Sequence, residues 1–139
     1  MQKIQTNELP IRSYAYIGDA VYEVFVREKT IFLTSKSNEL HNLTSSVVKA
    51  EFHANVLEKI QDFLNEEEKE IVRRARNLSV TTARRTNQSL HRLSTAFEAL
   101  VGYLYLHEKN RLKALFDFIE PLIDEKLKYI TKTLLRIRN

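Results

Sequence analysis

Apolar residues recur three or four positions apart along most of the chain, which is the spacing of one face of an α-helix. The pattern predicts a first helix over residues 9 to about 33, with Pro10 in its first turn. A second apolar stripe predicts one helix over residues 40–60. A third helix is expected from a cap at Asn65 to about Asn77, because three glutamates directly after Asn65 suit a helix N-terminus.

The second half of the chain continues this helical pattern after one interruption. Residues 78–88 are rich in Thr, Ser and Arg without clear periodicity, and they predict a loop. Glu98 is the only charged residue over 96–106, which indicates a central, buried helix. A last apolar stripe over 112–137 is interrupted by Pro121, which should start a new helix or kink the existing one. We therefore expect an all-α fold.

Composition fits one soluble domain. The chain has 139 residues, of which 9–120 would form the core and 121–139 a C-terminal helical extension. Two Gly and two Pro leave few turn signals, which favours helices over strands. Without Cys there are no disulfides and no thiolate metal sites. No signal peptide or apolar run of membrane-spanning length is present, so we expect a cytoplasmic protein with no membrane partner. We also expect no nucleotide cofactor.

Both glycines lie within apolar, helix-like segments, and each is near a lone carboxylate. Gly18 directly precedes Asp19, and Gly102 follows Glu98 by one helical turn. A glycine in a helix interior costs about 1 kcal/mol relative to alanine, and burying an unpaired carboxylate costs more. We infer that Gly18 and Gly102 let two helices approach closely, so that Asp19 and Glu98 converge on one site.

Two converging carboxylates suit a divalent cation. Mg²⁺, with Mn²⁺ as a substitute, commonly takes one or two carboxylates and completes its shell with water and phosphate oxygens. A second interpretation stays open, in which Asp19 and Glu98 are buried partners of Arg or of Ser and Thr hydroxyls. Glu23 lies one turn after Asp19 and is a candidate outer-shell ligand, although it also fits a solvated glutamate.

Positive charge is concentrated in one part of the chain. Residues 71–97 contain six Arg and no Asp or Glu, although the whole chain has a net charge of only +4. Guanidinium and amide groups suit contacts with phosphate and sugar, and an acid-free window of this length favours nucleic acid over a merely solvated face. The candidate RNA-binding residues are Arg73, Arg74, Arg76, Asn77, Arg84, Arg85 and Gln88.

The four histidines form no zinc pattern, but one of them belongs to a rival motif. Arg85 and His91 are separated by five residues, which resembles the signature of the metal-independent nuclease family called higher eukaryotes and prokaryotes nucleotide-binding. This short pattern predicts a nuclease whose activity resists chelation.

Two segments together carry a more specific resemblance. The stretch Tyr16-Ile17-Gly18-Asp19-Ala20-Val21-Tyr22-Glu23 and the stretch over 94–106 resemble the two signature segments of the ribonuclease III catalytic domain. The match is nearest to the Mini-ribonuclease III subfamily. Arg73-Arg74-Ala75-Arg76-Asn77 is similar to a basic element of that subfamily, and Leu40-His41 falls where it has a similar pair.

The resemblance implies an all-helical homodimer that cleaves double-stranded RNA, leaving a 5′-phosphate and a 3′-hydroxyl. It implies Mg²⁺ held by Asp19 and Glu98, and the precursor of large-subunit (23S) ribosomal RNA as substrate. The wider family has four carboxylates at the metal site, and Ala15 and Thr95 occupy the other two positions here, as in the Mini subfamily. Thr95 is thus a second outer-shell candidate.

Three further expectations follow from this resemblance. No double-stranded-RNA-binding domain is expected, and the apolar helix around Glu98 should contribute to a core between subunits. Because two family carboxylates are missing, the alternative function is a catalytically silent RNA-binding or ribosome-assembly module with the same fold.

Overall fold

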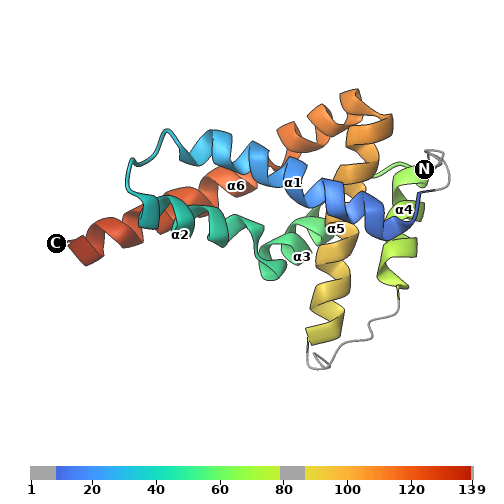
Figure 1. Cartoon of the computed structure of the whole chain (residues 1–139), viewed down its shortest axis with the longest axis horizontal. Helices are drawn as coiled ribbons and strands as arrows, with labels where there is room; N and C mark the ends of the chain where they lie inside the picture. Colours follow the sequence, from blue (N-terminus) through green and yellow to red (C-terminus); the bar gives the residue numbers. More distant parts are fainter. Residues whose placement is uncertain (1–8, 79–86, 139) are drawn as a thin grey trace, which may run out of the picture.

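The computed structural model of the chain describes residues 9–78 and 87–138, which fold into six helices without any strand (Figure 1). The helices are α1 (Ile11–Thr30), α2 (Ser37–Val48), α3 (Ala50–Lys59), α4 (Glu66–Arg76), α5 (Gln88–His107) and α6 (Lys109–Arg138). The all-α prediction is confirmed. Most of the predicted loop, residues 79–86, lies outside the described residues.

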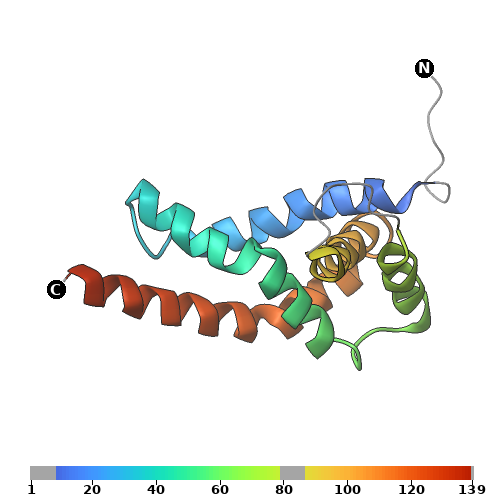
Figure 2. The same cartoon turned by 90° about the horizontal axis from the view of Figure 1, so that it is seen from below.

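Helix α5 lies at the centre of the fold. It packs against α1, α3, α4 and α6, and Figure 2 shows it nearly end-on among its neighbours. Six of its apolar side chains are fully buried, as the single charge in this stretch predicted; these are Ala96, Phe97, Ala99, Leu100, Val101 and Leu104. Because four helices contact α5, the side chains on its different faces meet different elements.

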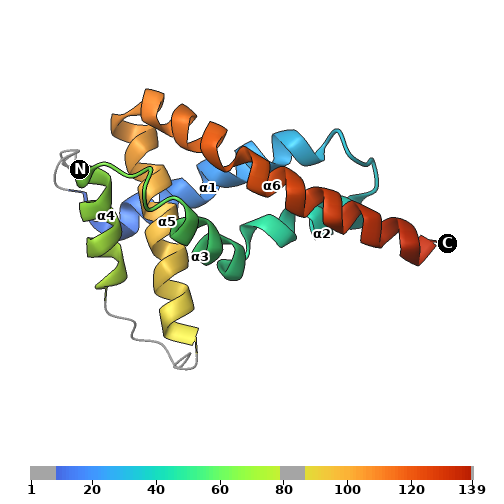
Figure 3. The ribbon, with the colours of Figure 1, turned by 180° about the vertical axis from the view of Figure 1, so that it is seen from behind.

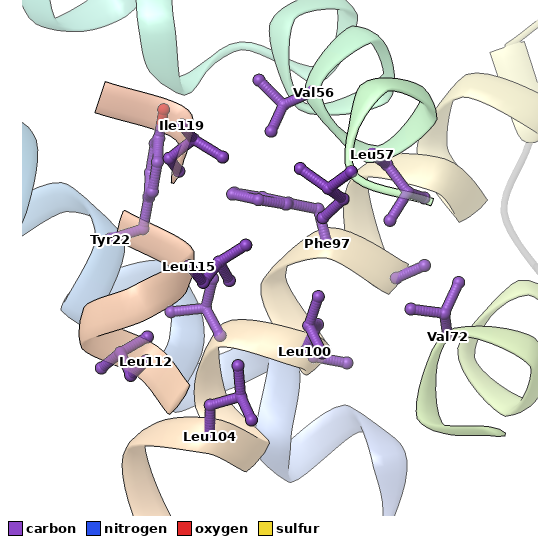
Figure 4. Packing of buried hydrophobic residues seen from close by; sticks show 14 of the residues in the cluster. Tyr22, Val56, Leu57, Val72, Phe97, Leu100, Leu104, Leu112, Leu115 and Ile119 are labelled. Carbon is purple, nitrogen blue, oxygen red and sulfur yellow. The ribbon is translucent and has the colours of Figure 1, made fainter. Parts of the chain in front are cut away.

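The core around α5 is built largely of aliphatic side chains and a few aromatic rings (Figure 4). Tyr22 of α1 and Phe97 of α5 meet edge to face, with ring centroids 5.2 Å apart. Leu115 and Ile119 of α6 are fully buried beside them. This contact fixes α1 and α6 on α5, the helix that also carries Glu98.

The predicted single helix over residues 40–60 was wrong, because the chain breaks at Lys49. Lys49 is extended, with φ −74° and ψ 158°, and separates α2 from α3. The break lets the two pieces face different partners, since α2 packs on α1 and α6 whereas α3 packs on α5. No Gly or Pro marks this position, so the apolar stripe alone suggested one continuous helix.

Helix α4 begins as its sequence predicts. Asn65 and Glu68 form a capping box, in which the Asn65 side chain accepts from the Glu68 backbone N–H and the Glu68 carboxylate accepts from that of Asn65, both at 2.9 Å. Glu68 is only 1% exposed and also accepts two hydrogen bonds from Arg111 of α6, at 2.6 and 2.8 Å. The start of α4 is thereby attached to α6.

Helix α6 passes through Pro121 without a break, so of the two expected effects the proline does not start a new helix. A proline inside a helix removes one backbone hydrogen bond. Here Leu115, Ile119, Ile123 and Leu127 bury a single apolar face on both sides of Pro121, and this packing holds the helix together. Seen from behind in Figure 3, α6 extends beside α2, while α4 and α5 run side by side.

Candidate active site

Helices α1 and α5 cross with their backbones in close contact at the two glycines. A Cβ atom on Gly18 would collide with the carbonyl oxygen of Glu98 and would lie 2.7 Å from the amide nitrogen of Gly102. A Cβ atom on Gly102 would collide with the carbonyl oxygen of Tyr14. Only glycine fits at either position, because both obstacles are backbone atoms that cannot rotate away.

Directly beside this crossing, Asp19 and Glu98 line the same open pocket, which has a volume of about 560 Å³. The pocket is formed by one face of α1 and one face of α5; its lining residues are Arg12, Ala15, Tyr16, Ile17, Asp19, Ala20, His91, Thr95 and Glu98. Asp19 is exposed, whereas the Glu98 side chain is only 21% exposed. The pocket therefore presents one open and one partly buried carboxylate.

Burial of Glu98 and the nearby charge of Asp19 both raise the pKa of the Glu98 carboxyl group. Burial is the larger effect, and together they raise the pKa of Glu98 from 4.5 to about 7. A hydrogen bond from the Ser94 hydroxyl to Glu98 Oε1, at 3.2 Å, works in the opposite direction by stabilising the charged carboxylate. The two acids thus repel each other at the pH where both are ionised.

This donor set fits a divalent cation that takes few protein ligands. A cation between Asp19 and Glu98 would relieve their repulsion, and carboxylate oxygens are the ligands that Mg²⁺ and Mn²⁺ prefer. Across residues 9–78 and 87–138 no group of three or more His, Cys, Asp or Glu side chains is arranged to hold a metal. Water and substrate phosphate would therefore have to supply the remaining ligands.

The two candidate outer-shell residues differ in position. Thr95 lines the pocket with Asp19 and Glu98. Glu23 does not line it and instead accepts a hydrogen bond from Arg27 at 3.0 Å on the surface of α1. An outer-shell role for Glu23 stays a prediction that this geometry does not favour.

The basic residues gather around a second pocket, which we call the basic pocket. It has a volume of about 570 Å³ and is lined by Gln61, Lys69, Val72, Arg73, Arg76, Asn77, Ser89, Arg92 and Leu93. None of these residues is acidic. Arg73 is held by Glu70 through two hydrogen bonds of 2.6 and 2.9 Å, whereas the Nε atom of Arg92 is buried and finds no hydrogen-bond partner in the described chain.

The other predicted RNA contacts have different places. Arg74 is exposed on α4 and lies near Tyr14 at the start of α1. Its positive charge lowers the pKa of Tyr14, but burial of Tyr14 has the larger effect and raises this pKa overall. Gln88 is the first residue of α5. Arg84 and Arg85 lie outside the described residues, as does half of the rival Arg85 and His91 motif.

Some residues in and around these pockets were missing from the predicted site. Lys69 lines the basic pocket together with Arg92, one of the six arginines of the acid-free window, and Ser94 and His53 lie behind Glu98. Ser94 could have been found from the sequence, because it precedes Glu98 by four residues and so shares its helix face. His53 lies 41 residues before Ser94, and no sequence pattern links them.

Comparison with known proteins places this geometry in a family. Residues 12–109 match the sequence model of the Ribonuclease III domain. A Mini-ribonuclease 3 from Thermoanaerobacter sp. (strain X514) is 44% identical over 114 residues, covering 80% of each chain. A Mini-ribonuclease 3 from Staphylococcus aureus (strain NCTC 8325 / PS 47) is 38% identical over 117 residues, covering 81% of this chain and 87% of the relative. The crystal structure of protein FN1578 from Fusobacterium nucleatum matches with a TM-score of 0.74 at 25% identity, covering 84% of this chain and 98% of that one.

The helical fold and the match of residues 12–109 to one family model agree on the family of this chain. The chain belongs to the ribonuclease III family. The curated relatives named above are Mini-ribonuclease 3 proteins, so the resemblance to that subfamily is confirmed. The chain is accordingly an endoribonuclease that acts on double-stranded RNA. None of its described helices is both long enough and apolar enough to span a membrane.

Proposed function

We propose that this endoribonuclease cleaves the double-stranded precursor of large-subunit (23S) ribosomal RNA in the cytoplasm, with Asp19 and Glu98 as its catalytic and metal-binding residues. The observation that supports this site is the convergence of the two carboxylates on one pocket beside the glycine crossing. The substrate follows from the subfamily resemblance.

Asp19 and Glu98 would hold the divalent cation on which the ribonuclease III family generally depends. When bound, Mg²⁺ or Mn²⁺ supplies a nucleophilic water and stabilises charge on the phosphodiester. Glu98 must be ionised to act as a ligand, and the Ser94 hydrogen bond favours that form. The rigid crossing of α1 and α5 sets the spacing of the two acids before RNA arrives.

The basic pocket and the exposed arginines of α4 would position the duplex. A-form RNA is recognised mainly through its phosphates and the 2′-hydroxyls of its minor groove, which guanidinium, amide and hydroxyl groups can contact. Arg76, Asn77 and Arg92 offer these groups around one pocket. Such contacts hold the RNA by its shape rather than by its sequence.

We also propose that the protein is a homodimer. The apolar side chains of α5 from Ala96 to Leu104 that are fully buried within one chain are not free to contribute to a core between subunits. Helix α1 exposes Tyr16 and Val24, which are 83% and 56% exposed, and Ile31, the residue directly after the helix, is 57% exposed. Together with Ala20 they form an apolar stripe on α1 that a second copy would cover.

Cleavage of duplex RNA tests the proposed site. Asp19→Asn and Glu98→Gln remove a ligand charge with little change in shape, and each should reduce cleavage by at least about a hundredfold. EDTA should abolish wild-type cleavage, and added Mg²⁺ or Mn²⁺ should restore it. Glu58→Gln, at an exposed position on α3, serves as the matched control.

The outcomes of that experiment distinguish the metal mechanism from the two alternative functions. Cleavage that survives chelation would reject the metal mechanism, and loss of that residual cleavage in His91→Ala would favour the rival motif. Tight duplex binding without cleavage in either metal would identify a silent RNA-binding module.

Sedimentation tests the proposed homodimer separately. Val24→Glu places a charge in the exposed stripe of α1 and should convert the dimer into a monomer. Tyr129→Glu, at an exposed aromatic residue near the end of α6, should leave the dimer intact. A wild-type monomer at micromolar concentration would reject the proposal.

A further inference from the structure

A chain of three hydrogen-bonding side chains lies behind the Glu98 carboxylate. The Ser94 hydroxyl donates to Glu98 Oε1 at 3.2 Å, and Ser94 Oγ lies 3.0 Å from His53 Nδ1. His53 Nδ1 and Glu98 Oε1 are 3.9 Å apart, which is too long for a direct hydrogen bond. His53 therefore reaches the carboxylate only through Ser94.

The number of available protons determines which group donates in each hydrogen bond between His53, Ser94 and Glu98. A serine hydroxyl carries one hydrogen, and with Glu98 ionised that hydrogen is used in the bond to Oε1. Ser94 Oγ can then only accept from His53, so His53 Nδ1 must carry a hydrogen. In the neutral ring Nε2 is then the unprotonated nitrogen. It is buried and has no hydrogen-bond partner in the described part of the chain.

The surroundings of His53 make it a rigid donor. Its side chain is 1% exposed, and its ring centroid lies 4.9 Å from those of both Tyr22 and Phe97. Tyr22 is itself fixed by a 2.6 Å hydrogen bond from its hydroxyl to the carbonyl oxygen of Val47. Packing between two aromatic rings leaves the imidazole little freedom to rotate.

We propose that His53 is a positioning residue which, through Ser94, orients the Glu98 carboxylate toward the bound divalent cation. The proposal rests on the proposed function, because it assumes that Glu98 is a metal ligand. The hydrogen bond from Ser94 occupies one lone-pair site of Oε1 and leaves the other carboxylate lone pairs to the cation. Without it, a glutamate would sample several rotamers on the pocket wall.

Groups that hydrogen-bond to metal ligands typically contribute tenfold to a hundredfold to metal affinity or activity. The deciding readout is therefore the affinity for Mn²⁺ in the absence of RNA, followed by electron paramagnetic resonance. Ser94→Ala should weaken Mn²⁺ binding by about tenfold. Ser46→Ala is the matched control, because Ser46 is also a buried serine but donates to Leu43 O at 2.7 Å, away from Glu98.

A double-mutant cycle tests whether His53 acts through Ser94. His53→Leu fills the core with an apolar side chain but removes the Nδ1–H donor to Ser94. As a single substitution it should weaken Mn²⁺ binding several-fold. In the Ser94→Ala background the same change should add nothing, because the route through the hydroxyl is already lost. Fully additive losses, or a Ser94→Ala affinity equal to wild type, would overturn the proposal.

Nitrogen-15 NMR of the histidine rings in the wild-type protein gives a second measurement that needs no variant to fold. At a pH above the raised pKa of Glu98, where this carboxylate is ionised, the proposal requires the neutral Nδ1–H tautomer of His53, and finding the Nε2–H tautomer there overturns it. Glu98→Gln separates the two hypotheses. Unchanged Mn²⁺ affinity in Glu98→Gln rejects the proposed metal site, whereas loss there together with unchanged affinity in Ser94→Ala rejects only the role of His53.

Discussion

Gly18 and Gly102 pass so closely that a Cβ atom on Gly18 would lie 2.7 Å from the backbone nitrogen of Gly102. Side chains of the core make other contacts between helices, such as the edge-to-face rings of Tyr22 and Phe97. At this crossing the backbones themselves set the distance between α1 and α5. The two carboxylates of the site therefore inherit a fixed separation.

Replacing either glycine by alanine should destabilise the protein, although alanine is the better helix former by about 1 kcal/mol. The added methyl groups would strike backbone carbonyl oxygens of Glu98 and Tyr14. Overpacking of this kind costs about 1–3 kcal/mol, and both variants should lose free energy of unfolding in urea. Asn55→Ala, at an exposed position of α3, gains helix propensity without a clash and should be unchanged or more stable. Stabilisation by Gly18→Ala would contradict the close crossing.

The raised pKa of Glu98 makes the stability of the metal-free protein depend on pH. Between pH 4.5 and about 7 the folded chain holds a proton on Glu98 that the unfolded chain has released. Stability should therefore fall as pH rises through this window, by about 1–3 kcal/mol, and level off above it. Glu98→Gln stays neutral and should lack this decline. Urea unfolding of both proteins in EDTA, at about pH 5 and about pH 8, measures the difference.

The difference in free energy of unfolding between wild type and Glu98→Gln separates the pH dependence due to Glu98 from that due to His53. Burial lowers the pKa of His53 to about 4, so His53 contributes stability that is lost as pH falls from 6.5 toward 4. This opposite slope is present in wild type and in Glu98→Gln alike. A decline of equal size in both proteins would show that Glu98 titrates normally.

The ion pair between buried Glu68 and partly exposed Arg111 should contribute to stability. Glu68 is 1% exposed and accepts from Arg111 and from the Asn65 backbone, whereas Arg111 also donates to the carbonyl oxygen of Phe63 at 3.1 Å. Glu68→Ala would leave Arg111 without its acid and remove the capping box, and it should cost about 2–3 kcal/mol.

An exposed pair on the same helix supplies the control for Glu68. Glu70 and Arg73 form an equally short ion pair, but both side chains are more than half exposed. Glu70→Ala should leave the melting temperature almost unchanged, because solvent screens such pairs. Equal losses from the two substitutions would show that burial does not decide the strength of these pairs.

The basic pocket should contribute salt-dependent, sequence-independent RNA affinity. Arg76→Ala and Arg92→Ala should each weaken binding to every duplex by a similar factor and reduce the slope of log affinity against log salt by about one. Lys128→Ala, at an exposed position on α6, is the matched control and should change neither quantity. Filter binding in Ca²⁺ over a salt series measures both; an unchanged slope in the arginine variants would place the RNA elsewhere.

The features that could be predicted from the sequence are local ones. The Asn65 cap depends on residues three positions apart, and the buried character of α5 depends on the single charge in its apolar stretch. Each glycine with its neighbouring carboxylate also stands out within one helical turn. These patterns need no knowledge of the partner helix.

The features that could not be predicted depend on which helices meet. The break at Lys49 follows from the different partners of α2 and α3, and no residue type marks it. His53 contacts Ser94 only because α3 packs on α5. The extent to which α1, α3, α4 and α6 cover the apolar side chains of α5 could not be predicted either, and it is complete for Phe97 and Leu100 but not for Leu106.

Glu98 takes part in the site through two different atoms. Its carbonyl oxygen occupies the space that a Cβ atom on Gly18 would need, and its carboxylate faces the pocket shared with Asp19. An engineer who grafts this acidic pair onto another pair of helices would therefore have to transfer Gly18 and Gly102 as well. Copying the two acids alone would place them on helices held apart by ordinary side chains, too far apart to share one ion.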